Sequence, residues 1–379
     1  MPATYDLGFL GGGQLARMSI QAAQRMGVRC LSLDPSGDTP ASQIADAVQG
    51  RLDDAGKIAE IFSRCERVTL ENEFIPAAAI REALGLSGRP TETLVPGVET
   101  LAIIQDKLHQ RQALAAAGVA SPKAVPLDDG GAMAREEIGF PMVLKARFGG
   151  YDGKGTRYAK TPEELELHRP LWEGGGWLAE EFVPFRRELA VMVATDGRRT
   201  VELETVETIQ TNHVCDVTFP ARLGPFGAAD TQGVPTAAVR AVGGIGLFGV
   251  EMFETMDGRV LVNELAPRPH NTGHYTLDWG DLSQFDHHVR LTLGLDFSRS
   301  AGADVLMANL LGQAEGPPLE VARRALLEFE PQARLHWYGK AESKPGRKMG
   351  HINLVCGGDG AGALERLRRC REVFQGWTG

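Results

Sequence analysis

The stretch of residues 143–155 reads VLKARFGGYDGKG and joins strand-forming residues to a loop rich in glycine. The predicted strand carries Lys145, and the loop contains Lys154. Glycines let backbone N–H groups approach phosphate oxygens, and a lysine on the strand adds positive charge to the same polyphosphate. The spacing misses that of a Walker loop by one residue, and Gly155 stands where that motif has Ser or Thr. We expect a phosphate-binding loop of another kind, with an ordinary hairpin turn as the alternative.

The segment of residues 177–191, WLAEEFVPFRRELAV, suggests a place for a purine base. Backbone groups near Val183, at the end of a predicted strand, could pair with the edge of the base, and Glu188 on the next strand could bind ribose hydroxyls. Apolar side chains would cover the ring. Taken alone, a surface strand with alternating acids is the alternative interpretation.

Residues 249–264, GVEMFETMDGRVLVNE, predict a β-hairpin that turns at their Asp-Gly dipeptide. Pairing counted outward from this turn places Thr255 opposite Val260 and then Glu251 opposite Glu264, with Cβ atoms roughly 5 Å apart. Facing carboxylates repel unless a cation lies between them, and hard oxygen ligands select magnesium. The hairpin therefore predicts a magnesium site, with a solvated carboxylate pair as the alternative.

The segment of residues 265–276, LAPRPHNTGHYT, follows this hairpin directly. Its two prolines and its glycine exclude a regular helix, so His270 and His274 are not a helical zinc pair. A loop that displays Arg268, His270 and Asn271 remains. Guanidinium and amide donors would suit a small oxyanion such as bicarbonate or its phosphorylated form, with a merely structural loop as the alternative.

A basic cluster lies late in the chain, in residues 338–351, YGKAESKPGRKMGH. It contains Lys340, Lys344, Arg347 and Lys348, although the whole protein has a formal net charge of -9. A local cluster of this kind could bind a small anionic substrate. A solvated charged loop is the alternative interpretation.

The N-terminal region alternates predicted strands with helical stretches, which indicates a parallel sheet. The strands are residues 5–10 (YDLGFL), 29–33 (RCLSL) and 67–70 (RVTL), and a triple-glycine turn follows the first of them. Ligands of open parallel sheets collect beyond the carboxyl ends of the strands. We expect one crevice there, formed by Gly11 to Gln14, Asp34 and Glu71 to Glu73.

Composition excludes several classes of protein. With 379 residues the chain suggests two or three domains, and 43% hydrophobic with 23% charged residues is typical of a globular protein. The negative net charge argues against binding of nucleic acid. Five cysteines without a C-x-x-C pair predict neither zinc nor disulfides, and neither a signal peptide nor a membrane segment is recognisable. We expect a cytoplasmic enzyme.

A nicotinamide dehydrogenase is the strongest alternative from another class of function. Gly11, Gly13 and Ala16 satisfy G-x-G-x-x-[GA], and Asp34 follows at the distance of a ribose contact. That interpretation leaves the second glycine loop, the facing glutamates and the basic cluster unexplained. A non-catalytic nucleotide-binding regulator would keep the ATP residues without needing the carboxylate pair.

Taken in order, these segments resemble the ATP-grasp superfamily and, within it, the carboxyaminoimidazole ribonucleotide synthetases of purine biosynthesis. The resemblance runs nearly end to end through LGGGQLARM, QDKL, VLKARFGGYDGKG, EEFVPFRREL, VNELAPRPHNTGHYT, SQFDHH and YGKAESKPGRKMGH. It implies an α/β and α+β fold: a Rossmann-like parallel-sheet domain binding the acceptor (1–98), an ATP-grasp domain (99–295) and a small C-terminal domain completing the acceptor site (296–379).

The resemblance also implies which residues bind each ligand. ATP would contact Lys107, Lys145, Gly150, Tyr151, Asp152, Gly153, Lys154, Gly155, Thr156, Glu180, Glu181, Phe182, Val183, Glu188, Gln210, Asn263 and Glu264. Glu251 and Glu264 would hold two magnesium ions. Arg268, His270 and Asn271 would surround bicarbonate. Glu73, Asp152, Lys340 and Arg347 would face the aminoimidazole ribonucleotide, whose phosphate we place at Gly13, Gln14 and Leu15.

The implied reaction forms carboxyphosphate from bicarbonate and ATP, and the amine of the ribonucleotide captures its carbon or released carbon dioxide. Asp152, Lys340, Arg347 and Arg268 are the predicted catalytic residues, and Asp152 is the candidate to take the amine proton. Lys107 and Gln210 depart from the family, which often has Arg and His at these positions. Within the ligases, a related ATP-grasp enzyme that uses formate or another acyl donor is the alternative. A homodimer is expected.

Overall fold

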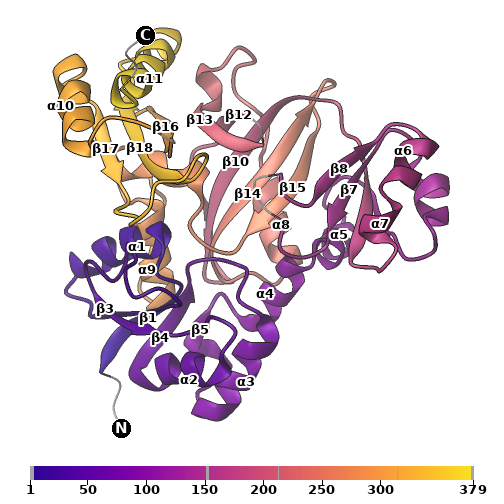
Figure 1. Ribbon diagram of the computed structural model, residues 1–379, viewed down its shortest axis with the longest axis horizontal. Coiled ribbons are helices and arrows are strands. Elements are labelled where there is room, and N and C mark those ends of the chain that lie inside the picture. The colour runs from indigo at the N-terminus through magenta and orange to yellow at the C-terminus, as the bar shows by residue number, and fades with distance from the viewer. Residues whose placement is uncertain (1–3, 151–152, 212, 314, 377–379) are drawn as a thin grey trace.

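The computed structural model describes residues 4–150, 153–211, 213–313 and 315–376, and Figure 1 shows three parts of the molecule around one large sheet. The N-terminal part is a parallel sheet in the order β3-β2-β1-β4-β5, as predicted. Helices cover both of its faces. Its elements are β1 (Tyr5–Leu10), α1 (Gln14–Gln24), β2 (Cys30–Asp34), β3 (Asp46–Gln49), α2 (Ala55–Arg64), β4 (Cys65–Leu70), α3 (Ala77–Ser87), η1 (Thr91–Thr93) and β5 (Leu94–Val95).

The alternation of side chains along β1 gives this sheet its two cores. Leu7 and Phe9 pack toward α1, whereas Leu10 belongs to the core formed with α2 and α3. All of these side chains are almost completely buried, which explains the uninterrupted apolar character of the strand. The loop after β1 is thereby fixed at the carboxyl edge of the sheet.

The helical stretch that precedes the small sheet is divided into two helices. The structure has α4 (Val98–Gln105) and α5 (Lys107–Ala116), separated at Asp106. Asp106 has extended backbone angles, and its carboxylate accepts a hydrogen bond of 3.0 Å from the N–H of Leu108, so it caps α5. Its other partner is Arg147, whose Nε donates to the same carboxylate over 2.9 Å.

The central part contains a small antiparallel sheet in the order β6-β9-β7-β8, packed on short helices at the right of Figure 1. β7 carries Lys145, and the glycine loop joins β7 to β8. The elements are β6 (Ala124–Pro126), η2 (Ala134–Ile138), β7 (Met142–Ala146), β8 (Thr156–Ala159), α6 (Pro162–Leu167), α7 (Arg169–Trp172) and β9 (Trp177–Glu181).

The large sheet runs in the order β15-β14-β10-β12-β13-β16-β18-β17, with β11 beside β10. β16 pairs with β13, so the sheet continues without a break across the predicted boundary at residue 296. The predicted domain limits remain a prediction. The elements are β10 (Phe185–Thr195), β11 (Thr200–Glu202), β12 (Val206–Thr211), β13 (Val214–Pro220), η3 (Ala221–Leu223), α8 (Val234–Ala241), β14 (Gly246–Thr255), β15 (Val260–Ala266), η4 (Asn271–Leu277), α9 (Gln284–Thr292), β16 (Val305–Leu311), α10 (Leu319–Phe329), β17 (Arg334–Trp337), β18 (Lys348–Val355) and α11 (Gly360–Phe374).

The hairpin of β14 and β15 has the predicted pairing of Glu251 with Glu264, but reaches it by a different register. The turn is one residue longer than expected, and Glu254 rather than Thr255 pairs with Val260. An irregularity in β15 near Asn263 then shifts the register back by one residue. Within the described residues, no helix is long and apolar enough to cross a membrane.

Replacing Asp106 by Ala should lower the free energy of unfolding by about 2–4 kcal/mol, because it removes a helix cap and leaves Arg147 without its carboxylate partner. Asp106→Asn keeps an oxygen that can cap α5, so its loss should be roughly half as large. Urea denaturation of the three proteins measures the difference. Equal stability of Asp106→Ala and the parent protein would contradict this account of the break between α4 and α5.

Candidate functional site

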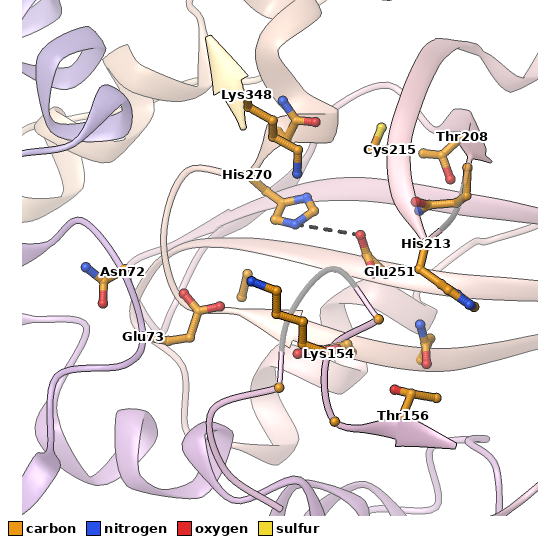
Figure 2. A pocket seen from close by; sticks show the side chains of 18 of the residues that line it. Asn72, Glu73, Lys154, Thr156, Thr208, His213, Cys215, Glu251, His270 and Lys348 are labelled. Carbon is orange, nitrogen blue, oxygen red and sulfur yellow. Dashed lines mark ion pairs between the residues drawn. The ribbon is translucent and has the colours of Figure 1, made fainter. Parts of the chain in front are cut away.

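A cavity of about 1380 Å³ lies where the three parts of the molecule meet. The residues predicted to bind ATP, magnesium, bicarbonate or the ribonucleotide all line it where they fall within the described ranges. Tyr151 and Asp152 lie outside those ranges, and Gly11 of the predicted crevice is not on the wall. Figure 2 shows Glu73, Lys154, Glu251 and His270 pointing into the same space. The predicted residues on its wall are Gly13, Gln14, Leu15, Glu73, Lys107, Lys145, Gly150, Gly153, Lys154, Gly155, Thr156, Glu180, Glu181, Phe182, Val183, Glu188, Gln210, Glu251, Asn263, Glu264, Arg268, His270, Asn271, Lys340 and Arg347.

Lys145 is held in place by a buried ion pair. Its Nζ lies 2.6 Å from Oε2 of Glu180, and Oε1 of Glu180 accepts a hydrogen bond of 2.9 Å from Arg111. Burial raises the pKa of the Glu180 carboxyl, but Arg111 and Lys145 outweigh burial and lower the pKa to about 2. Glu180 therefore stays ionised and fixes Lys145 beside the glycine loop.

The facing carboxylates lie opposite these lysines. Lys107 Nζ is 2.6 Å from Oε1 of Glu264, which places Lys107 between the phosphate loop and the carboxylate pair. Burial, Glu264 and Glu188 together raise the pKa of the Glu251 carboxyl to about 7. Such a raised pKa means that nearby protein cations do not fully compensate the negative charge of the pair.

Glu188, the predicted ribose ligand, is a second carboxyl with a raised pKa. Burial raises this pKa to about 7, while a hydrogen bond from Gln210 lowers it. Gln210 is one of the two positions at which the sequence departs from the pattern expected from the family resemblance. The Gln210 amide can donate a hydrogen bond to the Glu188 carboxyl at any pH, whereas a protonated histidine would also bring a positive charge.

The loop after β15 brings together two predicted substrate ligands. Arg268 donates to both carboxylate oxygens of Glu73, and the bond from Nη2 to Oε1 measures 2.7 Å. His270 Nε2 lies 3.6 Å from Oε1 of Glu251, as the dashed line in Figure 2 shows. Burial, Arg268 and Lys348 lower the pKa of His270 well below its usual value, so its imidazole is neutral. The Asn271 amide pairs with Asn309 of β16.

The amino end of α1 is already in contact with a carboxylate. Glu71 Oε1 accepts a hydrogen bond of 3.3 Å from the N–H of Leu15, and a Cβ atom at Gly13 would collide with that oxygen. Asp34 accepts from the N–H of Gly12 over 2.9 Å. Gly13 therefore gives room to Glu71, and a phosphate bound at this turn would have to share the position with Glu71.

Three cations of the basic cluster reach the cavity. Lys340 donates from Nζ to the backbone oxygen of Lys348 over 2.6 Å, and Arg347 donates to the backbone oxygen of Glu342 over 2.9 Å. These bonds hold the loop before β18 in shape. Lys344 instead forms an exposed ion pair with Glu342 at 2.8 Å. Of the basic cluster, Lys344 is therefore solvated, whereas Lys340, Arg347 and Lys348 line the cavity.

Sequence reasoning gave no role to several residues of the cavity wall. Several of them are sequence neighbours of predicted site residues, as Phe74 is of Glu73 and Arg187 of Glu188, but they form no motif that would single them out. His274 had been noted only as part of an excluded zinc pair, and the neighbouring cation Lys348 only as a member of the basic cluster. Wall residues without a predicted role of their own include Ser36, Asp38, Thr39, Phe74, Arg186, Arg187, Glu207, Thr208, Cys215, His274 and Lys348.

The carboxylate pair fits a divalent cation that also binds a phosphate. Among the described residues, no group of three His, Cys or acidic side chains is arranged to hold a metal ion by itself. Glu251 and Glu264 supply two oxygen ligands, which is what magnesium commonly takes from a protein when phosphate oxygens and water complete its coordination. The residues present therefore fit magnesium accompanying a nucleotide.

Three family models match consecutive parts of the chain. The Ribonucleotide synthetase preATP-grasp domain matches residues 4–105, and the ATP-grasp domain matches residues 112–285. The Phosphoribosylaminoimidazole carboxylase C-terminal domain matches residues 305–362. Their order agrees with the three parts of the structure, and the expected fold class is confirmed.

Curated relatives and a solved structure agree with these matches. The N5-carboxyaminoimidazole ribonucleotide synthase of Synechococcus elongatus is 38% identical over 97% of this chain and 93% of its own length. The Phosphoribosylaminoimidazole carboxylase of Ogataea methanolica is also 38% identical, but this chain spans only 66% of it. The structure of an Aspergillus clavatus N5-carboxyaminoimidazole synthase with ADP and 5-aminoimidazole ribonucleotide has a TM-score of 0.86 and 29% identity, covering 99% of both chains.

Replacing Glu188 by Gln should stabilise the protein at pH 8 and leave it unchanged at pH 4.5 or below. The raised pKa means that the folded protein holds the Glu188 proton more tightly, so stability falls as pH rises from about 4.5 through about 7. At pH 8 the free energy of unfolding of Glu188→Gln should exceed that of the parent protein by about 3 kcal/mol. Urea denaturation across this range measures it, and Glu66→Gln, at an exposed position of β4, is the control. A gain that does not depend on pH would contradict the prediction.

Proposed function

The chain belongs to the N5-carboxyaminoimidazole ribonucleotide synthase family, and on that premise we propose that it carboxylates the amine of 5-aminoimidazole ribonucleotide with bicarbonate and ATP. The products are N5-carboxyaminoimidazole ribonucleotide, ADP and phosphate, in purine biosynthesis. One observation carries the proposal: a single cavity joins the lysine-bearing glycine loop, the facing carboxylates and the basic cluster. ATP, bicarbonate and an anionic acceptor thus have adjoining places.

The nucleotide lies between the small sheet and the large sheet. Lys145 and Lys107 carry positive charge to its phosphates from opposite sides, and Glu180 keeps Lys145 in position. Glu188 binds the ribose, and the backbone around Val183 meets the base. Glu251 and Glu264 hold magnesium, which when bound neutralises charge on the phosphoryl oxygens.

Bicarbonate lies against the loop after β15. Its oxygen attacks the terminal phosphorus of ATP, ADP leaves, and carboxyphosphate forms. His270 is neutral, so it can donate one hydrogen bond to the oxyanion. Because it has no positive charge, it does not attract the nearby carboxylates of Glu251 and Glu264. Arg268 adds a guanidinium whose direction Glu73 fixes.

The acceptor ribonucleotide meets this site from the N-terminal and C-terminal parts. Lys340 and Arg347 bind it from the basic cluster, and Glu73 faces its amine. The amine nitrogen forms a bond to the carbon of carboxyphosphate, or of carbon dioxide released from it, and phosphate leaves. Asp152, outside the described residues, takes the amine proton. We further propose that the protein acts as a homodimer in the cytoplasm.

The family matches argue against the dehydrogenase alternative. Asp34, its expected ribose contact, accepts the N–H of Gly12 within the turn. A phosphate-release assay tests the proposal against the remaining alternatives by adding or omitting bicarbonate, formate, the ribonucleotide and NAD. Phosphate release that requires bicarbonate and the ribonucleotide, with one carboxylated product per ATP, is the expected result. Release driven by formate instead would overturn the substrate assignment.

Replacing Glu264 by Gln should abolish ATP cleavage, with kcat falling about a hundredfold or more, because it removes the charge of one of the two facing carboxylates and the ionic partner of Lys107. The fold should survive, as circular dichroism can check. Normal turnover at ordinary magnesium concentration would move the metal site elsewhere.

Replacing Arg347 by Met should raise the KM for the ribonucleotide about tenfold, a loss of roughly 1.4 kcal/mol, and leave the KM for ATP nearly unchanged. The reason is that Arg347 reaches the cavity from the C-terminal part, whereas Lys145 and Lys107 serve the nucleotide. Lys344→Met is the matched control, since Lys344 is paired with Glu342 at the surface. A raised KM for ATP alone would contradict this division of roles.

A further inference from the structure

A buried pair of amides joins the bicarbonate loop to the C-terminal part of the sheet. Asn271 Nδ2 donates to Oδ1 of Asn309 over 2.9 Å, and Asn309 Nδ2 donates to Oδ1 of Asn271 over 2.6 Å. Asn309 is 1% exposed and Asn271 is 9% exposed. Two complementary bonds between planar amides fix both the distance and the orientation of the two groups.

Asn309 also connects this pair to a third element. Its Nδ2 donates to the backbone oxygen of Cys215 in β13 over 2.7 Å. Both protons of Nδ2 and the oxygen of the amide are then used, so the side chain has one allowed orientation. A single residue of β16 therefore ties η4 to the sheet at a point next to His270.

The loop is held from its other side by α9. Gln284 accepts the N–H of His270 over 2.9 Å and donates to the backbone oxygen of the same residue, also over 2.9 Å. His270 thus lies between two buried amides, Gln284 at its own backbone and Asn309 at the next residue. Its Nε2 faces Glu251 as a result.

We propose that Asn309 is a positioning residue for ATP cleavage: it sets the loop that carries His270 against the carboxylate pair. The inference rests on the proposed function. It gives the Asn271 amide a structural partner in addition to its predicted contact with bicarbonate, because both polar atoms of that amide meet Asn309. A displacement of about 1 Å at a reacting group can cost about a hundredfold in rate, so a contact one residue away is sufficient to control turnover.

Asn309→Leu tests the contact by keeping much of the volume while removing every hydrogen bond. It leaves the Asn271 amide and the oxygen of Cys215 buried without partners, so the loop should shift to find new ones. We expect kcat to fall about tenfold or more, with the KM values for ATP and ribonucleotide changed less than threefold. Leu310→Ala is the matched control, because Leu310 is buried in the core on the opposite face of β16. It should lower the melting temperature and spare kcat.

Asn309→Asp gives a readout that simple destabilisation would not change. In the ionised carboxyl, an oxygen replaces Nδ2 and faces two other hydrogen-bond acceptors, Oδ1 of Asn271 and the backbone oxygen of Cys215. These oxygens repel one another and displace the loop, so kcat should be low at pH 8. Below its own pKa the new carboxyl regains a proton to donate to Asn271. Activity relative to the parent protein should therefore recover as pH falls, whereas Asn309→Leu should show no such recovery.

The outcomes separate this inference from the proposed function. The parent protein is first assayed for phosphate release that requires bicarbonate and ribonucleotide, and failure there would overturn the proposed function itself. With that activity present, a kcat within twofold of the parent in Asn309→Leu would overturn the positioning role. An Asn309→Asp protein with the same pH profile as the parent would do so as well.

Discussion

Two partly buried carboxylates face each other across β14 and β15, and their mutual repulsion is the constraint around which the rest of the cavity is arranged. Lys107 meets Glu264 directly, while the imidazole beside Glu251 stays neutral. The negative charge is thus only partly balanced by the protein. Such a site favours a ligand that carries a cation for the carboxylates and an anion for the lysines. A metal-bound polyphosphate is a ligand of this kind.

The cations of the cavity are in turn held by carboxylates that take no part in this pair. Lys145 forms an ion pair with Glu180, and Arg268 forms one with Glu73. Such pairs are weak contributors to stability, since removing charges from water offsets much of their attraction. Their value lies in geometry: each cation has a fixed direction before a substrate reaches it. His270 is also fixed before a substrate binds, in this case by two uncharged amides, those of Gln284 and Asn309.

Local patterns in the sequence were sufficient to predict the elements but not the contacts between them. The limits of β1, the parallel sheet and the strand carrying Lys145 follow from apolar runs and glycines. The pairing of Glu251 with Glu264 was predicted correctly because two register errors cancel, a longer turn and an irregularity in β15. The cap at Asp106 is a local contact with Leu108, but the ion pair of Asp106 with Arg147 joins residues distant in sequence and has no local signal. The Asn271–Asn309 pair has no local signal at all.

The unbroken large sheet decides where the molecule can bend. β13 and β16 share ladder hydrogen bonds, so the central and C-terminal parts form one stiff plate, and a hinge between them would require breaking the ladder. The small sheet is not part of this plate; side-chain pairs such as Arg111 with Glu180 connect it to its surroundings. A movement that leaves this ladder intact can involve the small sheet, which carries Lys145 and the start of the glycine loop.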